Sequence, residues 1–279
     1  MVLVTKANGE EELFQPDKLR RSLERAGAHA ETVARIVTRV EGELRDGMTT
    51  AEIYRHAFEL LKREEDKPIA ARYSLRRAIM ELGPSGFPFE SFLAELFRQE
   101  GYRATTNVYL SGKCTEHEID VLAENDARVV AVEAKFHNES GYKTDLKGVL
   151  YVNARAGDLK ETHFDGKETS GKEGAVWLIT NTKFTHNAIR YAECAGLTII
   201  GWTYPHHGNL HDLIDASGLH PVSCLTTLSQ AQKNLLLERR IVLCRFLMEH
   251  PETLQEIGLS AAKTDTVIQE ARGLCAPRR

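Results

Sequence analysis

The 279-residue sequence predicts an α/β protein in three parts: a small helical unit with an N-terminal β-hairpin over residues 1–84, an α/β core over 85–205 and a helical region over 206–279. Three observations predict this layout. β-Branched runs separated by turn residues concentrate in the middle of the chain, apolar residues at helical spacing dominate both ends, and glycine and proline cluster at the first junction. The hydrophobic fraction of 42% is that of an ordinary globular protein.

The composition also limits where the protein acts and what it binds. A net charge of −4 at pH 7 is inconvenient for a nucleic-acid-binding protein, because basic side chains normally neutralise the phosphates. No apolar run approaches the roughly 18–20 residues of a membrane helix, and no secretory signal opens the chain, so we expect a cytoplasmic protein with no membrane partner. The five cysteines are widely spaced without a C-x-x-C pair, which favours reduced thiols over disulfides or zinc ligands.

The first part begins with a hairpin and continues as helices. Leu3–Thr5 and Glu12–Phe14 have strand composition, and Asn8-Gly9 between them is a strong turn signal. Thr49 and Glu52 have the spacing of a capping box, which predicts a helix start. Helices are expected from Pro16 to Arg25, from Ala30 to Leu44, from Thr49 to Arg63 and from Pro68 to Leu82.

This part resembles the ATP-cone, a regulatory nucleotide-binding module best known from ribonucleotide reductases. The resemblance is carried by Val4–Gly9, Phe14–Leu19 and Ile69–Arg76. It implies that ATP or dATP binds at five residues: Val4, Lys6, Asn8, Gly9 and Lys18. The two lysines would pair phosphate as point charges, whereas Ala7 stands where the family usually has Arg. The alternative is a small helical bundle with scattered surface lysines.

The core contains a second hairpin, formed by Glu116–Leu122 and Val129–Phe136 around a polar turn. If the turn is centred between residues 126 and 127, antiparallel pairing places Asp120 directly opposite Glu133, with Cβ atoms roughly 5 Å apart. Side chains alternate along a strand, so Lys135 shares the face of Glu133, while the residues between and after them point into a core.

An Asp, a Glu and a Lys on one sheet face suit phosphodiester hydrolysis. Two carboxylates at this spacing can hold Mg²⁺, which prefers oxygen ligands and keeps waters that a phosphate can displace. The metal polarises the phosphoryl oxygen, and the ammonium group orients the attacking water or offsets developing charge. The alternative is an ordinary hairpin with a solvated charged face, because the spacing alone has many chance matches.

The surroundings of this hairpin resemble the PD-(D/E)xK nucleases, in particular the Mrr-type branch, over residues 86–204. The first motif is Glu118-Ile119-Asp120 without a preceding proline, and Glu133-Ala134-Lys135 is intact. The resemblance implies a restriction-endonuclease-like αβββαβ core. Besides the hairpin, its expected elements are the helix Phe89–Phe97, the strand Thr105–Leu110, the helix Lys143–Ala156, the strand Ala175–Asn181, the helix Phe184–Ala195 and the strand Leu197–Trp202.

The same resemblance implies a Mg²⁺-dependent DNA endonuclease of restriction type. Asp120 and Glu133 would bind the metal, and both would be catalytic together with Lys135. Glu90, on the helix before the sheet, would be a fourth catalytic group, because members of this branch often carry an acidic residue there. They also often carry a polar residue on the helix after the lysine, where this sequence offers Lys143, Lys147 and Tyr151 but no Gln.

The last part reads as helical from Ser223 onward. Apolar residues recur at helical spacing from Leu235 to Met248, and a second helical stretch breaks at Gly258 before continuing through Ala271. Helix, short glycine-containing hairpin and helix resemble a helix-hairpin-helix element, whose backbone amides hold a DNA phosphate. A plain packed helical tail is the alternative. At the start of this part, ahead of Ser223, we expect exposed loop histidines at 206, 207 and 211, with a metal site as the alternative.

Together these features predict an enzyme that cuts DNA with Mg²⁺ and is regulated by ATP or dATP at its N-terminal part. Its partners would be DNA and the nucleotide, and the sequence leaves a homo-oligomer open. Two other functions stay open. One is a nucleotide-responsive DNA-binding regulator whose nuclease fold is catalytically silent, and the other is a repair or junction nuclease.

Overall fold

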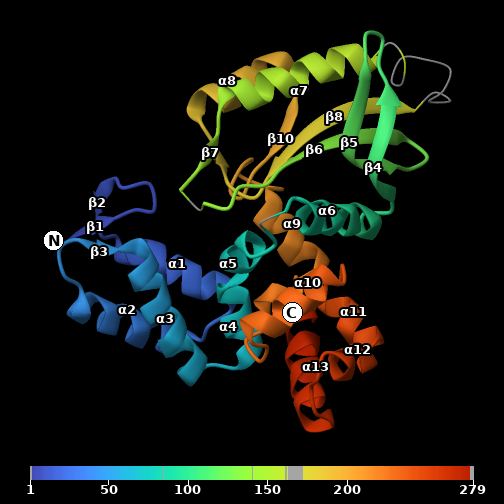
Figure 1. The fold of residues 1–279 in the computed structure, drawn as a ribbon. Helices are drawn as coiled ribbons and strands as arrows, with labels where there is room; N and C mark the ends of the chain where they lie inside the picture. The colour runs from blue at the N-terminus through green and yellow to red at the C-terminus, as the bar shows by residue number, and fades with distance from the viewer. Residues whose placement is uncertain (1, 84, 140, 161, 163–171, 277–279) are drawn as a thin grey trace. The chain divides into compact units, whose positions relative to one another are not determined.

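The computed structural model describes every residue except 1, 84, 140, 161, 163–171 and 277–279 (Figure 1). The chain divides into two compact units. One unit combines both ends of the sequence, residues 1–79 and 220–279, with the short segment 139–141, and the other contains residues 80–138 and 142–219. Each unit is described by itself below.

The N-terminal part of the first unit is the expected hairpin followed by helices. Strands β1 (Leu3–Thr5) and β2 (Glu11–Leu13) pair antiparallel, with Leu3 opposite Leu13. A strand that was not predicted, β3 (Met48–Thr49), pairs parallel with β1. Two residues are too few to leave a sequence pattern, so β3 becomes visible only through its pairing.

The helices of this part begin and end close to the expected residues. Thr49 caps its helix as predicted, because Glu52 N donates to its Oγ1 and Thr49 N donates to the Glu52 carboxylate. The last predicted helix is divided into two helices, because the chain turns at Ser74, whose Oγ donates to Ala71 O at 2.8 Å. The helices are α1 (Pro16–Ala26), α2 (Ala30–Glu43), α3 (Thr50–Glu64), α4 (Lys67–Tyr73) and α5 (Leu75–Met80).

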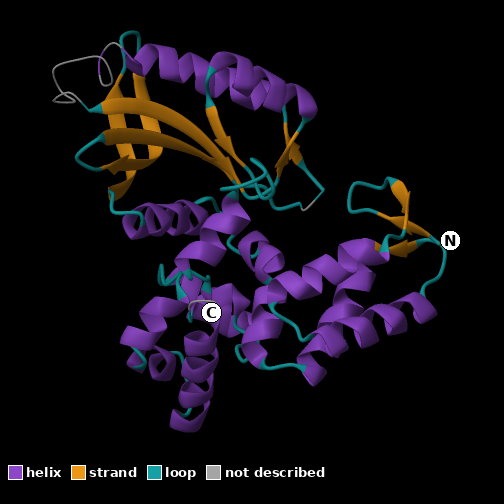
Figure 2. Ribbon diagram, turned by 180° about the vertical axis from the view of Figure 1, so that it is seen from behind, coloured by secondary structure: helices purple, strands orange, loops and turns teal. Residues whose placement is uncertain are grey.

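The second unit is built on a five-stranded sheet in the order β10-β8-β6-β5-β4. Strands β4, β5 and β6 pair antiparallel with one another in that order. Strand β8 then pairs parallel with β6, and β10 pairs parallel with β8. Helices α7 and α8 cover one face of the sheet, and α6 covers the other (Figures 1 and 2). The elements are α6 (Phe87–Gln99), β4 (Arg103–Ser111), β5 (Glu116–Glu124), β6 (Arg128–Lys135), β7 (Lys143–Thr144), α7 (Leu146–Leu159), β8 (Glu173–Thr180), β9 (Lys183–Phe184), α8 (His186–Ala195), β10 (Thr198–Ile200) and α9 (Leu210–Ser217).

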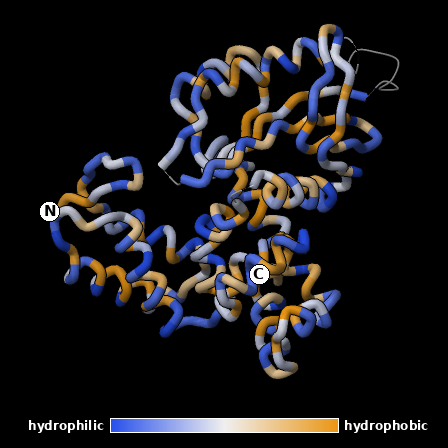
Figure 3. The backbone as a smooth tube through the Cα atoms, viewed as in Figure 1, coloured by the Kyte–Doolittle hydropathy of each residue, from blue (hydrophilic) through white to orange (hydrophobic). Residues whose placement is uncertain are grey.

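The central strand β6 lies between two helical layers, which bury it on both faces. Residues 130–132 of β6 are fully buried in a row, as expected for a strand covered on both faces. Figure 3 shows hydrophobic stretches along the strands of this sheet. On the α6 side, the ring of Phe136 packs 5.5 Å from that of Phe89, which confirms the inward direction predicted for Phe136.

Helix α9 packs against α6, and this compact unit runs to Leu219. His206 and His207 are exposed, as expected. The expectation for His211 is wrong: it lies in α9, is 9% exposed and packs edge-on against Trp202 at 5.3 Å. His211 stands between Leu210 and Asp212, and only the tertiary packing of α9 shows that its own side chain lies inside.

The C-terminal helices belong to the first unit. The apolar stretch from Leu235 to Met248 is not one helix, because Arg240 adopts a left-handed φ of 61° and Ile241 N bonds back to Leu236 O. The elements are η3 (Val222–Cys224), α10 (Gln230–Glu238), α11 (Cys244–Glu249), α12 (Glu252–Glu256) and α13 (Ala261–Cys275). The buried Glu270 carboxylate ties α13 to the loop after η3, accepting hydrogen bonds from the amides and hydroxyls of Thr226 and Thr227.

Candidate functional site

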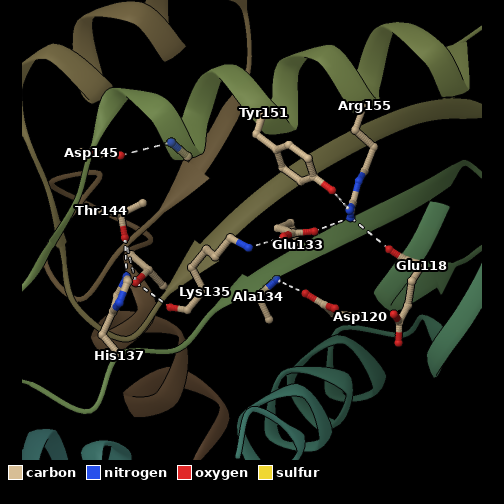
Figure 4. Close-up of polar contacts among 12 residues, drawn as sticks. Glu118, Asp120, Glu133, Ala134, Lys135, His137, Thr144, Asp145, Tyr151 and Arg155 are labelled. Atoms are coloured by element: carbon tan, nitrogen blue, oxygen red, sulfur yellow. Dashed lines mark hydrogen bonds and ion pairs between the residues drawn. The ribbon is translucent and has the colours of Figure 1, made fainter.

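The β5–β6 register sets the position of the two predicted metal ligands. The paired residues run from Glu124 opposite Val129 to Val121 opposite Val132, the register that the predicted turn requires. One position further along, Asp120 and Glu133 lie at the open end of the pairing. There the Asp120 Oδ2 atom accepts a hydrogen bond from Ala134 N at 2.6 Å, in place of a backbone pair (Figure 4).

The strand on the other side of Asp120 is also irregular. Thr106 pairs with Val121 and Val108 with Ile119, so Asn107 stands opposite Asp120 without a ladder pair. Asn107 has a φ of 56°, a left-handed conformation that is uncommon outside glycine and that asparagine tolerates best. Irregular backbone therefore lies beside Asp120, where such features often accompany a functional residue.

Glu133 is 5% exposed and both of its carboxylate oxygens face a cation. Oε1 lies 2.5 Å from the Nζ atom of Lys135, and Oε2 accepts from Nη1 of Arg155 on α7. The shared face that the sequence predicts for Glu133 and Lys135 is therefore present in the structure. The Lys135 side chain is 38% exposed and that of Arg155 only 9%, so the ammonium group can leave Glu133 more easily than the guanidinium can.

Arg155 is the site residue that the sequence did not reveal. Its guanidinium bonds Glu118 O at 3.0 Å and the Tyr151 hydroxyl at 2.7 Å in addition to Glu133, and it lies 5.0 Å from the Tyr151 ring centroid (Figure 4). A weak signal existed, because Tyr151 and Arg155 are four residues apart and share one face of a helix whose other inward residues are apolar. An arginine among Val149, Val152 and Leu159 needs a buried acid as its partner.

Two acidic groups near Glu133 hold their protons unusually tightly. Burial, followed by the charge of Glu133, raises the pKa of Asp120 to about 6. Burial, followed by the charges of Asp120, Glu118 and Glu133, raises the pKa of Glu90 to about 7. Among the described residues the buried Glu90 Oε2 atom has no hydrogen-bond partner. The predicted catalytic carboxylates thus influence one another electrostatically, and their negative charge is only partly compensated.

This arrangement fits a divalent cation that takes few protein ligands. Within the described part of the chain, no group of three or more His, Cys, Asp or Glu side chains is assembled as a complete metal cage. Mg²⁺ does not need one, because it is usually held by one or two carboxylates together with waters and substrate phosphates. The partnerless oxygen of Glu90 and the raised pKa of Asp120 show a partly buried acidic cluster whose charge a cation would stabilise.

The second candidate site lies on the hairpin of the N-terminal part. Lys6 and Lys18 meet at one carboxylate, since Glu12 Oε2 lies 3.3 Å from Lys6 Nζ and 3.1 Å from Lys18 Nζ. Hydrogen bonds to Glu12 and Glu10 raise the pKa of Lys6. Burial opposes the change at Glu12, but hydrogen bonds from Lys18 and Lys6 outweigh it and lower the pKa of that carboxyl. The two predicted phosphate-binding lysines are therefore adjacent and share an acidic partner.

The turn residues follow Lys6 along the chain, and Val4 is the strand partner of Glu12, the acid that both lysines contact. Gly9 N bonds Lys6 O at 2.9 Å with a left-handed φ of 81°, and the Asn8 carboxamide accepts from Glu10 N at 3.3 Å. Val4 is 2% exposed and packs in the core of this part. Its buried side chain leaves the backbone of Val4, opposite Glu12, as the part that could contact a nucleotide.

Comparison with known families divides the chain into three segments. Residues 2–81 match the ATP cone domain, residues 83–203 match a restriction endonuclease domain, and residues 220–275 match the AF1548-like C-terminal domain. An uncharacterized protein of Archaeoglobus fulgidus is 37% identical over 181 residues, which are 64% of this chain and 98% of the relative. The crystal structure of the protein of unknown function AF1548 superimposes with a TM-score of 0.54 at 34% identity, covering 68% of this chain and 98% of that one.

These matches define a restriction endonuclease domain that follows an ATP-cone domain, as the resemblances in the sequence predict. The chain belongs to the AF1548-like family. The structure of the MspJI restriction endonuclease in complex with a 27-mer oligonucleotide also aligns, covering 76% of this chain and 44% of that one at 14% identity. Its TM-score of 0.34 is too low for an inference. Among the described residues, no helix is both long and apolar enough to span a membrane.

Proposed function

We propose that this protein is a Mg²⁺-dependent DNA endonuclease of restriction type whose ATP-cone binds ATP or dATP and regulates cleavage. The observation that carries the nuclease part is the placement of Asp120 and Glu133 at the open end of the β5–β6 pairing, beside Lys135. Like-charged carboxylates gathered in a partly buried site cost folding free energy, and a bound cation would offset that cost. The restriction endonuclease match supplies DNA as the expected substrate.

Each of the four residues then has a role. Asp120 and Glu133 would hold Mg²⁺, which supplies Lewis-acid polarisation of the phosphoryl oxygen and a water of lowered pKa. The Lys135 ammonium group, partly exposed beside Glu133, would orient that water or stabilise the developing charge. Glu90, whose pKa of about 7 lies near the working pH, can accept a proton from the water.

The nuclease proposal is tested by incubating plasmid and linear DNA with the protein in Mg²⁺ and in EDTA. We expect strand breaks only with Mg²⁺, because without a cation between them the carboxylates would repel the DNA phosphates. Branched and junction DNA should be included, since preferential cleavage there would reassign the enzyme to repair. Full DNA binding with no cleavage of any substrate would instead favour the silent, DNA-binding regulator.

For the nucleotide part, the supporting observation is that Lys6 and Lys18 share one carboxylate partner. Nucleotide phosphates can replace the Glu12 carboxylate, since phosphate offers more acceptor oxygens and more charge. A ligand at a hundredfold excess over its Kd stabilises the folded state by about 2.7 kcal/mol. Thermal unfolding of the full chain should therefore shift upward with ATP or dATP and stay unchanged with adenosine. An equal shift with all three would contradict phosphate recognition by the lysines.

A further inference from the structure

The ATP-cone and the AF1548-like C-terminal domain form one compact unit, although they stand at opposite ends of the sequence. Their contact is made by α4 of the cone and the last turn of α13. Arg72 Nη2 donates to Gly273 O at 2.6 Å and to Leu274 O at 3.3 Å. A guanidinium at this place satisfies carbonyls that a helix end leaves without partners, and its charge complements the helix dipole.

Two further contacts make this interface specific. A Cβ atom added to Gly273 would lie 2.5 Å from Cγ of Pro68, at the start of α4, so no larger residue fits without moving one of the helices. The Pro68 ring is rigid and cannot turn aside. At α5, Ser223 Oγ of the C-terminal domain donates to Ala78 O at 2.7 Å. Both helices at the end of the cone are therefore held by the C-terminal domain.

The same helix α4 is attached on its other side to α1, which carries Lys18 of the candidate nucleotide site. Ser22, one turn after Lys18, hydrogen-bonds the Tyr73 hydroxyl, and Tyr73 is the neighbour of Arg72 in the chain. The Tyr73 ring also stacks on Tyr54 of α3 at 5.1 Å and lies in the core of the cone. A continuous set of contacts thus joins α1, which carries Lys18, to the end of α13.

We propose that nucleotide binding at the ATP-cone is coupled to the contact between the cone and the AF1548-like C-terminal domain. Docking of α13 on α4 and nucleotide binding would strengthen each other. The inference rests on the proposed nucleotide binding. Its sign follows from preorganisation: docked α13 fixes α4, and through Tyr73 and Ser22 it fixes α1, so less ordering remains to be done when nucleotide binds Lys18. Coupling of this kind is reciprocal.

Reciprocity provides the test, which is the Kd for ATP measured by calorimetry on the full chain. Gly273→Val should break the docking by collision with Pro68, and Arg72→Lys should weaken it by removing the two-carbonyl contact while keeping the charge. Neither residue belongs to the candidate nucleotide site. We expect both variants to raise the Kd for ATP by about fivefold or more. Amide hydrogen exchange in α13 should slow when ATP is added to the wild type.

Arg239→Met is the matched control, because Arg239 forms an exposed ion pair with Glu256 that involves neither α4 nor α13. Its Kd for ATP should equal that of the wild type. Circular dichroism checks the fold of each variant, and Arg72→Lys carries the test if Gly273→Val does not fold. An unchanged Kd in the folded variants would overturn the coupling while leaving nucleotide binding intact. A wild-type protein that binds no ATP would overturn the nucleotide proposal and this inference with it.

Discussion

The candidate active site and the candidate nucleotide site are both clusters of charge, but they differ in sign and in depth. At the active site, Asp120 and Glu133 lie on strands of a covered sheet, and burial raises the pKa of Asp120 to about 6. At the nucleotide site, Lys6 and Lys18 are partly exposed and share Glu12. A cation would stabilise the first site, whereas at the second site a phosphate would have to replace the Glu12 carboxylate. We therefore expect large effects at the first and small ones at the second.

The largest effect should come from the metal ligands. Asp120→Asn and Glu133→Gln keep the side-chain shape and remove the charge that holds Mg²⁺. Each should lower the single-turnover cleavage rate on the order of 10³-fold or more, because the metal supplies the main charge stabilisation in the transition state. Glu139→Gln, an acid outside the candidate site, is the control. Wild-type rates in both site variants would show that cleavage, if present, occurs elsewhere.

The next effect concerns how Glu133 is held. Arg155→Met leaves this buried carboxylate with Lys135 as its remaining cation, which should lower the free energy of unfolding by about 2–4 kcal/mol. Urea unfolding measures the difference. Arg190→Met on the exposed side of α8 is the matched control and should change stability by less than about 0.5 kcal/mol. Equal, small changes in the two variants would mean that Glu133 does not depend on Arg155.

A smaller, pH-dependent effect on stability distinguishes the cost of ionising the partly buried Asp120 from an effect of its packing. The folded pKa of Asp120 lies above its ordinary value, so its ionisation opposes folding: the cost is absent below about pH 4, grows up to about pH 6 and is constant above. In EDTA at pH 8, Asp120→Asn should therefore be more stable than wild type by about 1–2 kcal/mol, a figure reduced for partial exposure. The gain should vanish near pH 4. A variant less stable than wild type at every pH would contradict the claim that ionised Asp120 destabilises the folded state.

The smallest effect belongs to the nucleotide site. Glu12→Gln removes the anion that competes with phosphate for Lys6 and Lys18, so the Kd for ATP should fall by about two- to fivefold, the worth of exposed ion pairs. Calorimetry on the full chain measures it. Glu43→Gln, which removes a surface carboxylate on α2, is the control. Weaker ATP binding in Glu12→Gln would mean that Glu12 assists the nucleotide rather than competing with it.

Much of the fold could be predicted because its signals are local. The alternation of side chains and the position of the turn predict the register of β5 and β6 that the structure has. This register alone sets Asp120 beside Glu133. The two-residue strand β3 and the burial of His211 could not be predicted, since both depend on partners distant in sequence. The same holds for the joining of the two chain ends in one unit.

The candidate site was predictable only where its residues share a strand pair. Arg155 reaches Glu133 from a helix on the sheet face, and a helix pattern shows which side is inward without showing which acid it will meet. Glu12 was missed for a similar reason, because the hairpin register that brings it to Lys6 had no buried face to define it.

The central claim is that Asp120 and Glu133 form a divalent-metal site, and calorimetric titration with Mn²⁺ at pH 8 tests it most directly. Mn²⁺ prefers the same oxygen ligands as Mg²⁺. The wild-type protein should bind Mn²⁺, Asp120→Asn and Glu133→Gln should not, and wild-type affinity should weaken below pH 6 as Asp120 takes up a proton. Equal Mn²⁺ binding by all three proteins, or none by the wild type, would contradict the claim.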